Sequence, residues 1–380
     1  MCYNVKQTYT LIKKNKLQES RGRMLRYILI RTVWVFIILF AVLSINFIIF
    51  KLAPNYPPAE KDAREIFYAR QVNDGYMTDR LETDPVMIGK ILSGEIILPK
   101  GSYVAVERDG ARLRIFEPIP ISVQYVVWVK NVSQSNWGVS TRLRPNVPVF
   151  DILGERIEVT LRLNLIALIV YIPVGLFFGV LAALRKDSLT DNAISLGVMI
   201  FISIPSFVLM LFLVLVFGYQ LGWLPYRFPA ADVTGARFYT GMILPVLGLS
   251  FGSIAGLTRL TRAELSEVLT SEFVLLARTK GLSRPQAVIR HAMRNSLVPL
   301  VPSIIGSFVG LLSGSVVIER IYSIPGAGRL YLDALQNGNY DYNVLLALGA
   351  FYTSIGLLAS LLVDLSYGIV DPRIRMGGRK

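Results

Sequence analysis

The sequence contains a single cysteine, Cys2, and a single histidine, His291. One cysteine cannot form a disulfide within the chain, and neither residue has metal-ligand spacing, so no metal site is predicted. The phosphate-binding pattern GxxxxGK[ST] is absent too, which argues against a Walker-type nucleotide site in this chain. An intramembrane protease would need a histidine beside a serine, or an HExxH motif. His291 lies in a charged segment, and we interpret it as a surface or docking residue.

Charged residues are also scarce, at 17% of 380 residues, whereas 53% are hydrophobic and the mean hydropathy is +0.50. This composition is too apolar for the water-exposed surface of a soluble domain of this length. A membrane-spanning helix needs about 20 mostly apolar residues. Six such stretches predict an all-α membrane protein with six transmembrane helices: 32–50, 159–184, 194–221, 242–257, 297–318 and 344–370.

The net charge of +14 is unevenly distributed along the chain. Basic residues dominate segments 1–31, 259–296 and 371–380, whereas acidic residues slightly outnumber basic ones in 319–343. Loops rich in Lys and Arg stay in the cytoplasm, so both termini and 259–296 are predicted to be cytoplasmic. The first apolar stretch is too long for a signal-peptide core and is expected to be a retained helix. This distribution fits a lipid bilayer and gives no reason to expect nucleic acid as a partner.

Segment 51–158 is predicted to be a folded extracytoplasmic insert, with secondary structure of the α+β kind, between the first two spans. Two β-rich segments, 103–108 and 111–116, flank Asp109-Gly110, which suits a two-residue hairpin turn. We expect Leu113 and Ile115 to face one side of the hairpin, and to pack on segment 119–132 or on helix ends. The five-helix core then occupies 159–370, followed by a tail at 371–380.

The basic segment between the fourth and fifth spans carries signals for two helices. Apolar residues recur at helical spacing through Leu265, Val268, Leu269, Leu276 and Ala277. Arg278 and Lys280 then fall in the last helical turn, where cations are favourable, and Gly281 supplies a left-handed terminator. Ser283 followed by Gln286 forms a capping box for a second helix. The segment is therefore predicted to be a helix, a turn and a helix.

Several motifs together resemble the permease subunits of binding-protein-dependent ATP-binding-cassette (ABC) importers, in their dipeptide, oligopeptide and nickel group. They are ARTKGLS, RHAMRNSLVP, NWGVS, SIPSF, IERIYSIPGAGRL and LVDLSYGIVDPRIR. The resemblance covers nearly all of the chain except residues 55–117. It departs from the wider superfamily at Leu275 and Leu276, which replace the usual Glu-Ala-Ala opening of the cytoplasmic loop.

This resemblance implies the type I ABC importer permease fold and a bacterial plasma membrane location. It implies a second permease subunit, two ATPase subunits carrying ATP and Mg²⁺, an extracytoplasmic substrate-binding protein, and a peptide substrate. No cofactor is implied on this chain itself. The cytoplasmic loop would be a coupling helix that docks on the ATPase, through Ala277, Arg278, Lys280, Gly281, Ser283, Arg290 and Asn295.

Residues of the translocation pathway are harder to identify. Asp364 is the one acid within a predicted span, near its cytoplasmic end, where we favour a structural pairing over a gating role. Gly306, Gly310 and Gly314 share one stripe of the fifth span, which suits helix packing or a narrow pore. The turn at Pro325, Gly326 and Gly328 resembles part of the family's outer gate.

An ion-coupled secondary transporter or a channel subunit remains an alternative on hydropathy alone. The secondary transporter predicts no ATPase partner and a loss of transport when Asp364 is replaced by Asn, whereas a channel does not explain the capped helical segment. Peptides are the favoured substrates, with nickel complexes and glycosides left open.

Overall fold

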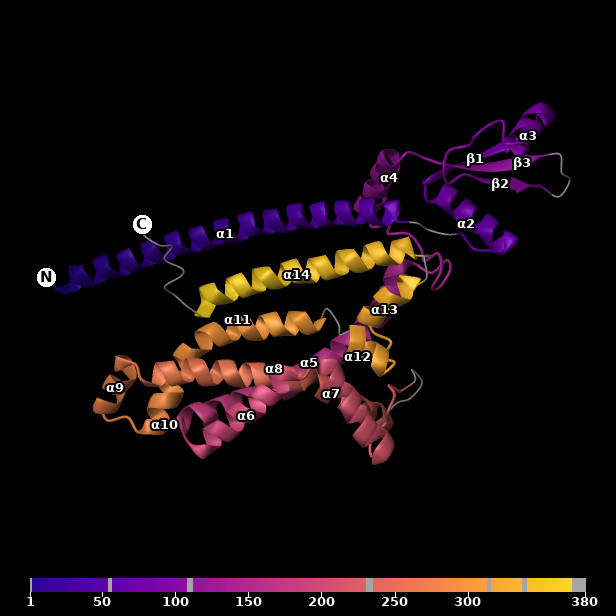
Figure 1. Ribbon diagram of the computed structural model, residues 1–380. Helices are drawn as coiled ribbons and strands as arrows, with labels where there is room; N and C mark the ends of the chain where they lie inside the picture. The colour runs from indigo at the N-terminus through magenta and orange to yellow at the C-terminus, as the bar shows by residue number, and fades with distance from the viewer. Residues whose placement is uncertain are drawn as a thin grey trace. The chain divides into compact units, whose positions relative to one another are not determined.

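The computed structural model describes residues 2–53, 57–107, 112–229, 235–312, 316–336 and 340–370. The chain divides into two compact units. The helical unit consists of Met1–Leu39, Arg156–Leu330 and Tyr352–Lys380, and the insert unit consists of Phe40–Glu155 and Tyr331–Phe351. Figure 1 labels the helices and strands along the chain.

Within the described residues, five helical segments are long and apolar enough to cross a membrane. They are Ile28–Leu52 of α1 (Cys2–Leu52), α5 (Val149–Leu184), α8 (Ala236–Leu269), Arg284–Gly310, and Tyr342–Tyr367 of α14 (Tyr342–Val370). A bent pair, Leu189–Ser203 and Ser206–Gln220, passes the same test as one broken span. The predicted six spans are found if this pair is counted once.

The break in the third span has a local cause in the sequence. Helix α6 (Leu189–Ser203) ends before Pro205, and α7 (Ser206–Leu213) continues into the π-helix η1 (Val214–Gln220) after a bend of 98°. A proline disfavours the helical conformation of the residue before it, and Ile204 is accordingly extended (φ −86°, ψ 121°). The predicted span at 194–221 is therefore present as a bent pair of helices, and the break within it was not predicted.

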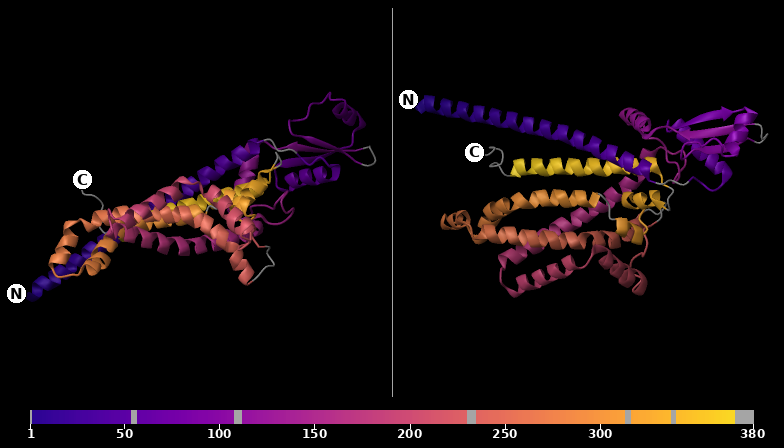
Figure 2. Two further views of the ribbon diagram at one scale, coloured as in Figure 1. Left: turned by 60° about the horizontal axis from the view of Figure 1, so that its bottom comes forward. Right: turned by 45° about the horizontal axis from the view of Figure 1, so that its top comes forward.

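Helix α8 is the centre of the helical unit, because α6, α7 and α11 (Met293–Leu312) all pack on it (Figures 1 and 2). Helix α5 also approaches closely: a Cβ at Gly175 would press on Leu257, and one at Gly179 would overlap Thr261. Thr258 Oγ1 donates to the Gly175 carbonyl at 3.2 Å. Small residues that allow close approach, and hydroxyls that bond across helices, are typical of membrane helix packing.

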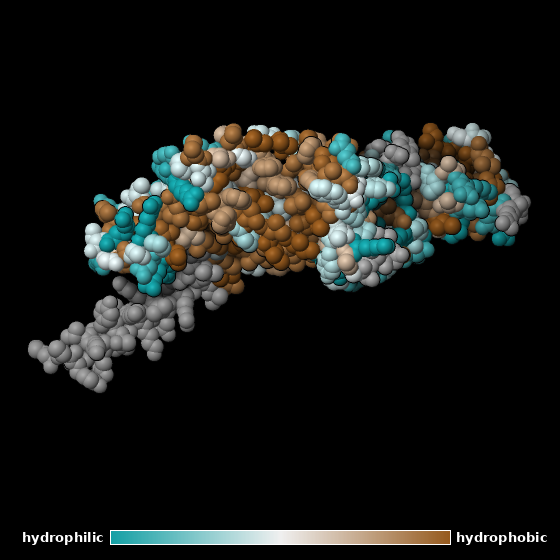
Figure 3. Space-filling model, turned by 90° about the horizontal axis from the view of Figure 1, so that it is seen from below, coloured by the Kyte–Doolittle hydropathy of each residue, from teal (hydrophilic) through white to brown (hydrophobic). Residues whose placement is uncertain are grey.

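The outer surface of the helical unit is apolar. Figure 3 shows a broad hydrophobic band over its helices, with hydrophilic residues beyond it. Large exposed apolar side chains on α6 and α7 include Leu196, Met199, Phe207, Leu211 and Phe212. Such an extended apolar surface requires lipid or protein around it.

The insert unit contains a three-stranded antiparallel sheet in the order β1-β3-β2. Its elements are α2 (Lys61–Asn73), β1 (Met77–Glu82), α3 (Pro85–Leu92), β2 (Tyr103–Val106), β3 (Leu113–Pro118) and α4 (Ile121–Ser133). The predicted pairing of β2 with β3 is found, whereas β1 was not predicted. The proposed Asp109-Gly110 turn lies outside the described residues.

Both faces of this sheet are covered. Leu113 and Ile115 are fully buried and pack with residues of α3, and Phe116 on the opposite face packs with Tyr68 of α2. Helix α4 instead places Trp128 against Phe47 of α1, with ring centroids 4.9 Å apart. The faces of the sheet therefore pack on α2 and α3 and not on segment 119–132 as predicted. That segment instead adjoins the start of β1, where the Ile119 N–H donates to the Tyr76 carbonyl at 3.1 Å.

Candidate functional site

The basic segment after α8 folds into two short helical pieces. Helix α8 ends at Leu269, and α9 (Glu272–Thr279) begins after Ser271, so the single first helix expected from the apolar spacing is interrupted. Gly281 then has a φ of +94°, which is the left-handed terminator that the sequence predicts.

The second piece begins with the predicted capping box. The Ser283 side chain accepts from the backbone of Gln286, and the Gln286 side chain accepts from the N–H of Ser283 at 3.2 Å. Helix α10 (Arg284–Ala287) passes directly through the π-helix η2 (Val288–Ala292) into α11. The second predicted helix is therefore the continuous beginning of the fifth span.

One side of the α9–α10 segment is buried against the rest of the helical unit. Val274, Ala287 and Ala292 pack with Ala183 of α5 and Leu265 of α8. Ala277 is only 7% exposed. Among the residues predicted for coupling, its side chain is therefore the one that this chain itself covers.

The opposite side, from α9 through α10 and η2 to the first turn of α11, is exposed, and we call it the docking surface. It carries the remaining residues singled out in the sequence: Arg278, Lys280, Gly281, Ser283, Arg290 and Asn295. It also carries the apolar side chains of Leu275, Leu276 and Ile289, which are 61%, 54% and 70% exposed. A mixture of cations and exposed aliphatic groups on a rigid support is suited to protein binding.

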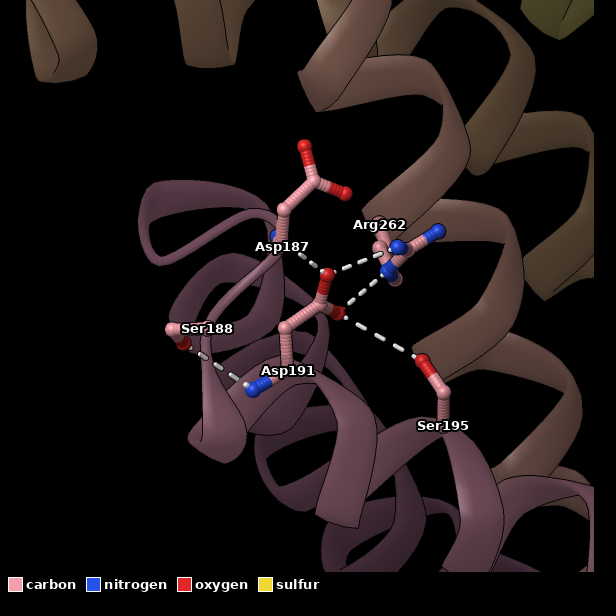
Figure 4. Close-up of polar contacts among 5 residues, drawn as sticks. All are labelled: Asp187, Ser188, Asp191, Ser195 and Arg262. Atoms are coloured by element: carbon pink, nitrogen blue, oxygen red, sulfur yellow. Dashed lines mark hydrogen bonds and ion pairs between the residues drawn. The ribbon is translucent and has the colours of Figure 1, made fainter.

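A buried ion pair fixes the structure beside the docking surface (Figure 4). Asp191, at the start of α6, accepts from Arg262 of α8 through two hydrogen bonds of 2.5 and 2.7 Å. The same carboxylate accepts from the backbone N–H of Asp187 at 2.9 Å and from the Ser195 hydroxyl at 3.4 Å. The Asp191 side chain is 1% exposed. The turn between α5 and α6 is thereby tied to the helix that leads into α9.

Two residues of the glycine stripe of the fifth span lie at the surface of this chain. Gly306 and Gly310 are exposed, and a Cβ at either would meet nothing within 4 Å, while Gly314 lies outside the described residues. Ser303 and Ser307 of the same helix line a groove of about 640 Å³ with Gly252, Gly256 and Arg259 of α8. Among the described residues of the stripe, Gly306 and Gly310 are therefore not closely packed against another helix of this chain.

Asp364 is paired, as the structural interpretation expects. Its Oδ2 lies 2.7 Å from Nη2 of Arg31 on α1, and the two side chains are 22% and 45% exposed. An ion pair of this kind lowers the cost of a carboxylate in a membrane helix.

The Pro-Gly turn encloses a carboxylate that the sequence analysis did not single out. Glu319 of α12 (Val316–Ile321) is 4% exposed and accepts from the Arg329 N–H at 2.7 Å and from Thr160 Oγ1 at 3.3 Å. Gly326 is buried directly against this carboxylate. Burial raises the pKa of Glu319, although these hydrogen bonds act in the opposite direction. The turn is therefore shaped around a buried acid.

Asp341 has a comparable position in the insert unit. It is fully buried and accepts from the Ser140 hydroxyl at 2.6 Å and from the backbone N–H groups of Thr141, Arg142 and Leu143 at 3.1–3.3 Å. Sequence reasoning missed Asp191, Glu319 and Asp341 because their partners lie far away along the chain. The only local signal was an acid beside a Pro-Gly turn or at a helix start.

Residues 175–376 match the family described as binding-protein-dependent transport system inner membrane component. The chain is 36% identical over 257 residues to the dipeptide transport system permease protein DppB of Lactococcus lactis, covering 68% of this chain and 82% of that protein. It is 30% identical over 356 residues to the oligopeptide transport system permease protein OppB of Salmonella typhimurium, covering 93% and 100%. The chain belongs to this family of inner membrane transport components.

A likeness to a solved structure is also found. The inward-facing MetNI methionine ABC transporter contains a chain that is 19% identical to this one, with a TM-score of 0.44. The match covers 61% of this chain and 99% of that chain.

Proposed function

We propose that this chain is the permease subunit of an ATP-driven ABC importer for peptides, located in a bacterial plasma membrane with both termini in the cytoplasm. A second permease subunit completes the pathway, two ATPase subunits bind ATP and Mg²⁺, and an extracytoplasmic protein delivers the substrate. The single observation that supports coupling is the docking surface, which is exposed on one side and anchored on the other.

Because the docking surface is anchored to the membrane helices, a movement imposed on it is passed on to them. A force applied to α9 reaches α5 and α8 through buried apolar contacts, and the Asp191–Arg262 pair ties the adjacent turn to α8. The second half of the segment continues without interruption into α11, which borders the open groove. Movement of an ATPase bound here is therefore transmitted to the helix that lines the pathway.

The groove supports the proposal of a paired permease. Its walls on α8 and α11 combine small residues with Ser253, Ser303 and Arg259, and a Cβ at Gly306 or Gly310, the described residues of the glycine stripe, would meet nothing within 4 Å. A partly polar, unfilled surface on membrane helices needs either water or another subunit opposite it. A second permease would close this half-channel around a solute.

Peptides are the substrate class that the relatives support. The names of two of them specify dipeptide and oligopeptide transport. A groove with glycine backbone, hydroxyl groups and one guanidinium provides contacts that tolerate varied side chains, as a pathway for peptides requires.

The proposal is tested by reconstituting the chain in proteoliposomes with the genetically neighbouring permease, ATPase and binding-protein subunits. We expect uptake of a labelled peptide that depends on ATP. Gly281→Val should abolish this uptake, because a β-branched residue is strained at a φ of +94°. A Cβ at this position has open space around it, so the effect comes from the turn and not from a clash.

Gly281→Asn is the matched control, because Asn adopts left-handed conformations more readily than Val. It should retain most of the uptake. Both variants should insert and express equally. Normal uptake by Gly281→Val, or equal loss in both variants, would contradict the role assigned to the turn.

A further inference from the structure

A second groove, of about 390 Å³, lies on a different side of α8 within the helical unit. Its walls come from three membrane helices, with Val174 and Phe178 on α5, Gly197 and Phe201 on α6, and Phe251 and Ile254 on α8. Phe201 and Phe251 stack with their centroids 4.9 Å apart. The volume falls within the range of about 300–1,000 Å³ that is typical of small-molecule sites.

The lining of this groove favours hydrocarbon. Its only polar side chain, among the residues the structure describes, is that of Thr258, and this hydroxyl already donates to the Gly175 carbonyl. A peptide or another polar solute would lose its hydrogen bonds to water without replacement. The groove follows α6 from Ala193 to Phe201, which is ~12 Å at the helical rise and suits an extended acyl chain.

The groove points toward a basic end of the helical unit. Helix α5 ends at Leu184, about 9 Å along the helix from Phe178. The exposed residues Arg185 and Lys186 follow immediately. Arg284 of α10 is also held at this end of the helix, since its Nη2 donates to the Leu184 carbonyl at 3.2 Å.

Cations exceed acids at this end. Asp187 is exposed in the same turn, whereas Asp191 is already bound by Arg262. Basic residues at a membrane boundary attract anionic lipid headgroups. A phosphate placed beside Arg185 and Lys186 would therefore sit within reach of an acyl chain that occupies the groove.

From this combination we infer that the groove between α5, α6 and α8 binds an anionic phospholipid. One acyl chain lies against Gly197, Phe201 and Phe251, and the phosphate lies at the turn that carries Arg185 and Lys186. The site is separate from the groove between α8 and α11 that we assign to the pathway. It also does not depend on the transported substrate.

Gly197 provides a direct way to fill the groove. A Cβ at Gly197 would meet nothing within 4 Å, so a larger side chain can enter the empty space without displacing protein atoms. Leu196 is the matched control, because it is the adjacent residue on α6, is 56% exposed and does not line the groove. Gly197→Trp and Leu196→Trp thus add similar bulk inside and outside the site.

The test is native mass spectrometry of the full chain, purified in mild detergent with equal amounts of phosphatidylglycerol and phosphatidylcholine. We expect one retained phosphatidylglycerol per chain in the wild type and in Leu196→Trp, and its loss in Gly197→Trp. The double variant Arg185→Gln, Lys186→Gln should reduce the preference for phosphatidylglycerol by about tenfold or more. Neutralising Lys90 and Lys100 in the insert unit should leave the preference unchanged.

A second measurement does not depend on the folding of a tryptophan variant. In a Cys2→Ser background, Leu196→Cys carrying a fluorophore, which adjoins the groove without filling it, should be quenched more strongly by brominated phosphatidylglycerol than by brominated phosphatidylcholine. Absence of a retained lipid, equal retention by Gly197→Trp and Leu196→Trp, or equal quenching by the two lipids would overturn the inference. A cross-link from the thiol of the Gly197→Cys variant to another protein chain would assign the groove to a protein partner and overturn it as well.

Discussion

Glu319 and Gly326 make a contact in which a single methyl group has a large effect. Gly326 is buried against the Glu319 carboxylate, and a Cβ added there would overlap it. We expect Gly326→Ala to lower the free energy of unfolding by about 1–3 kcal/mol, the usual cost of overpacking. Gly306→Ala, where the Cβ meets nothing within 4 Å, should change it by less than about 0.5 kcal/mol. Thermal unfolding in detergent measures both, and equal midpoints would contradict the described turn.

The raised pKa of Glu319 predicts a pH dependence with a definite sign. A carboxyl group with a raised pKa binds its proton more tightly in the folded state, so its contribution to stability is present at low pH. This contribution is lost as the pH rises through the folded-state pKa. Glu319→Gln cannot titrate and should lack this component.

The measurement is the difference in apparent unfolding midpoint between the wild type and Glu319→Gln across a pH series. The wild type should lose stability relative to Glu319→Gln as the pH rises above about 4.3, the ordinary pKa of a glutamate side chain. Glu267→Gln removes an acidic side chain at an exposed position and provides the control. Parallel curves for Glu319→Gln and Glu267→Gln would rule out a titrating Glu319.

The structural roles of individual residues were predictable from sequence where the residues that determine them are close neighbours along the chain. Gly281, Ser283 and Gln286 act within a few positions of one another, and the structure places them as expected. Glu319 and Asp341 were read as ordinary loop acids because Thr160 and Ser140 lie 159 and 201 positions away. Burial and pairing at such separations are products of the tertiary fold.

Among the elements, the junction of α5, α6 and α8 depends on the Asp191–Arg262 pair. We expect Asp191→Asn to destabilise the helical unit by about 1–3 kcal/mol, because Arg262 loses a buried, doubly hydrogen-bonded partner. This loss of stability is smaller than that for breaking a fully buried ion pair, since the Arg262 side chain is 33% exposed.

Asp187→Asn is the control for this change, because Asp187 is an exposed acid in the same turn. It should shift stability by less than about 0.5 kcal/mol. Exchanging the charges, with Asp191→Arg and Arg262→Asp together, should recover part of the loss relative to either single change. Equal stability of Asp191→Asn and Asp187→Asn would show that the pair does not hold the junction.

Element types followed from periodicity and apolar length, but their boundaries did not. Helix α5 begins at Val149, ten residues before the predicted span, since hydropathy detects only the apolar part of a helix. The bend at Ile204 and Pro205 was missed because a proline inside a membrane helix is compatible with either a kink or a break. The sheet was only partly predicted, since β1 pairs with a strand more than thirty residues away.

At the scale of the whole molecule, the sequence was sufficient to predict membrane insertion because a lipid environment constrains composition more strongly than packing does. It could not indicate which faces of the helices are covered. The structure separates a partly polar groove on α8 and α11 from an apolar groove on α5, α6 and α8. These two faces are expected to meet different neighbours, a solute pathway and lipid.

The source of energy for transport is also a property of the whole molecule. Asp364 distinguishes the two alternatives, ATP hydrolysis and an ion gradient. An ion-coupled transporter needs a carboxylate that takes up and releases its ion, whereas Asp364 is paired with Arg31 at 2.7 Å. We therefore expect Asp364→Asn to retain ATP-driven peptide uptake within about twofold, since a partly exposed ion pair contributes little. Reconstituted proteoliposomes, assayed with ATP or with a pH gradient alone, provide the measurement. The double variant Arg31→Asp, Asp364→Arg exchanges the two charges and controls for helix packing. Uptake that is driven by the pH gradient alone and is lost in Asp364→Asn would favour the secondary transporter.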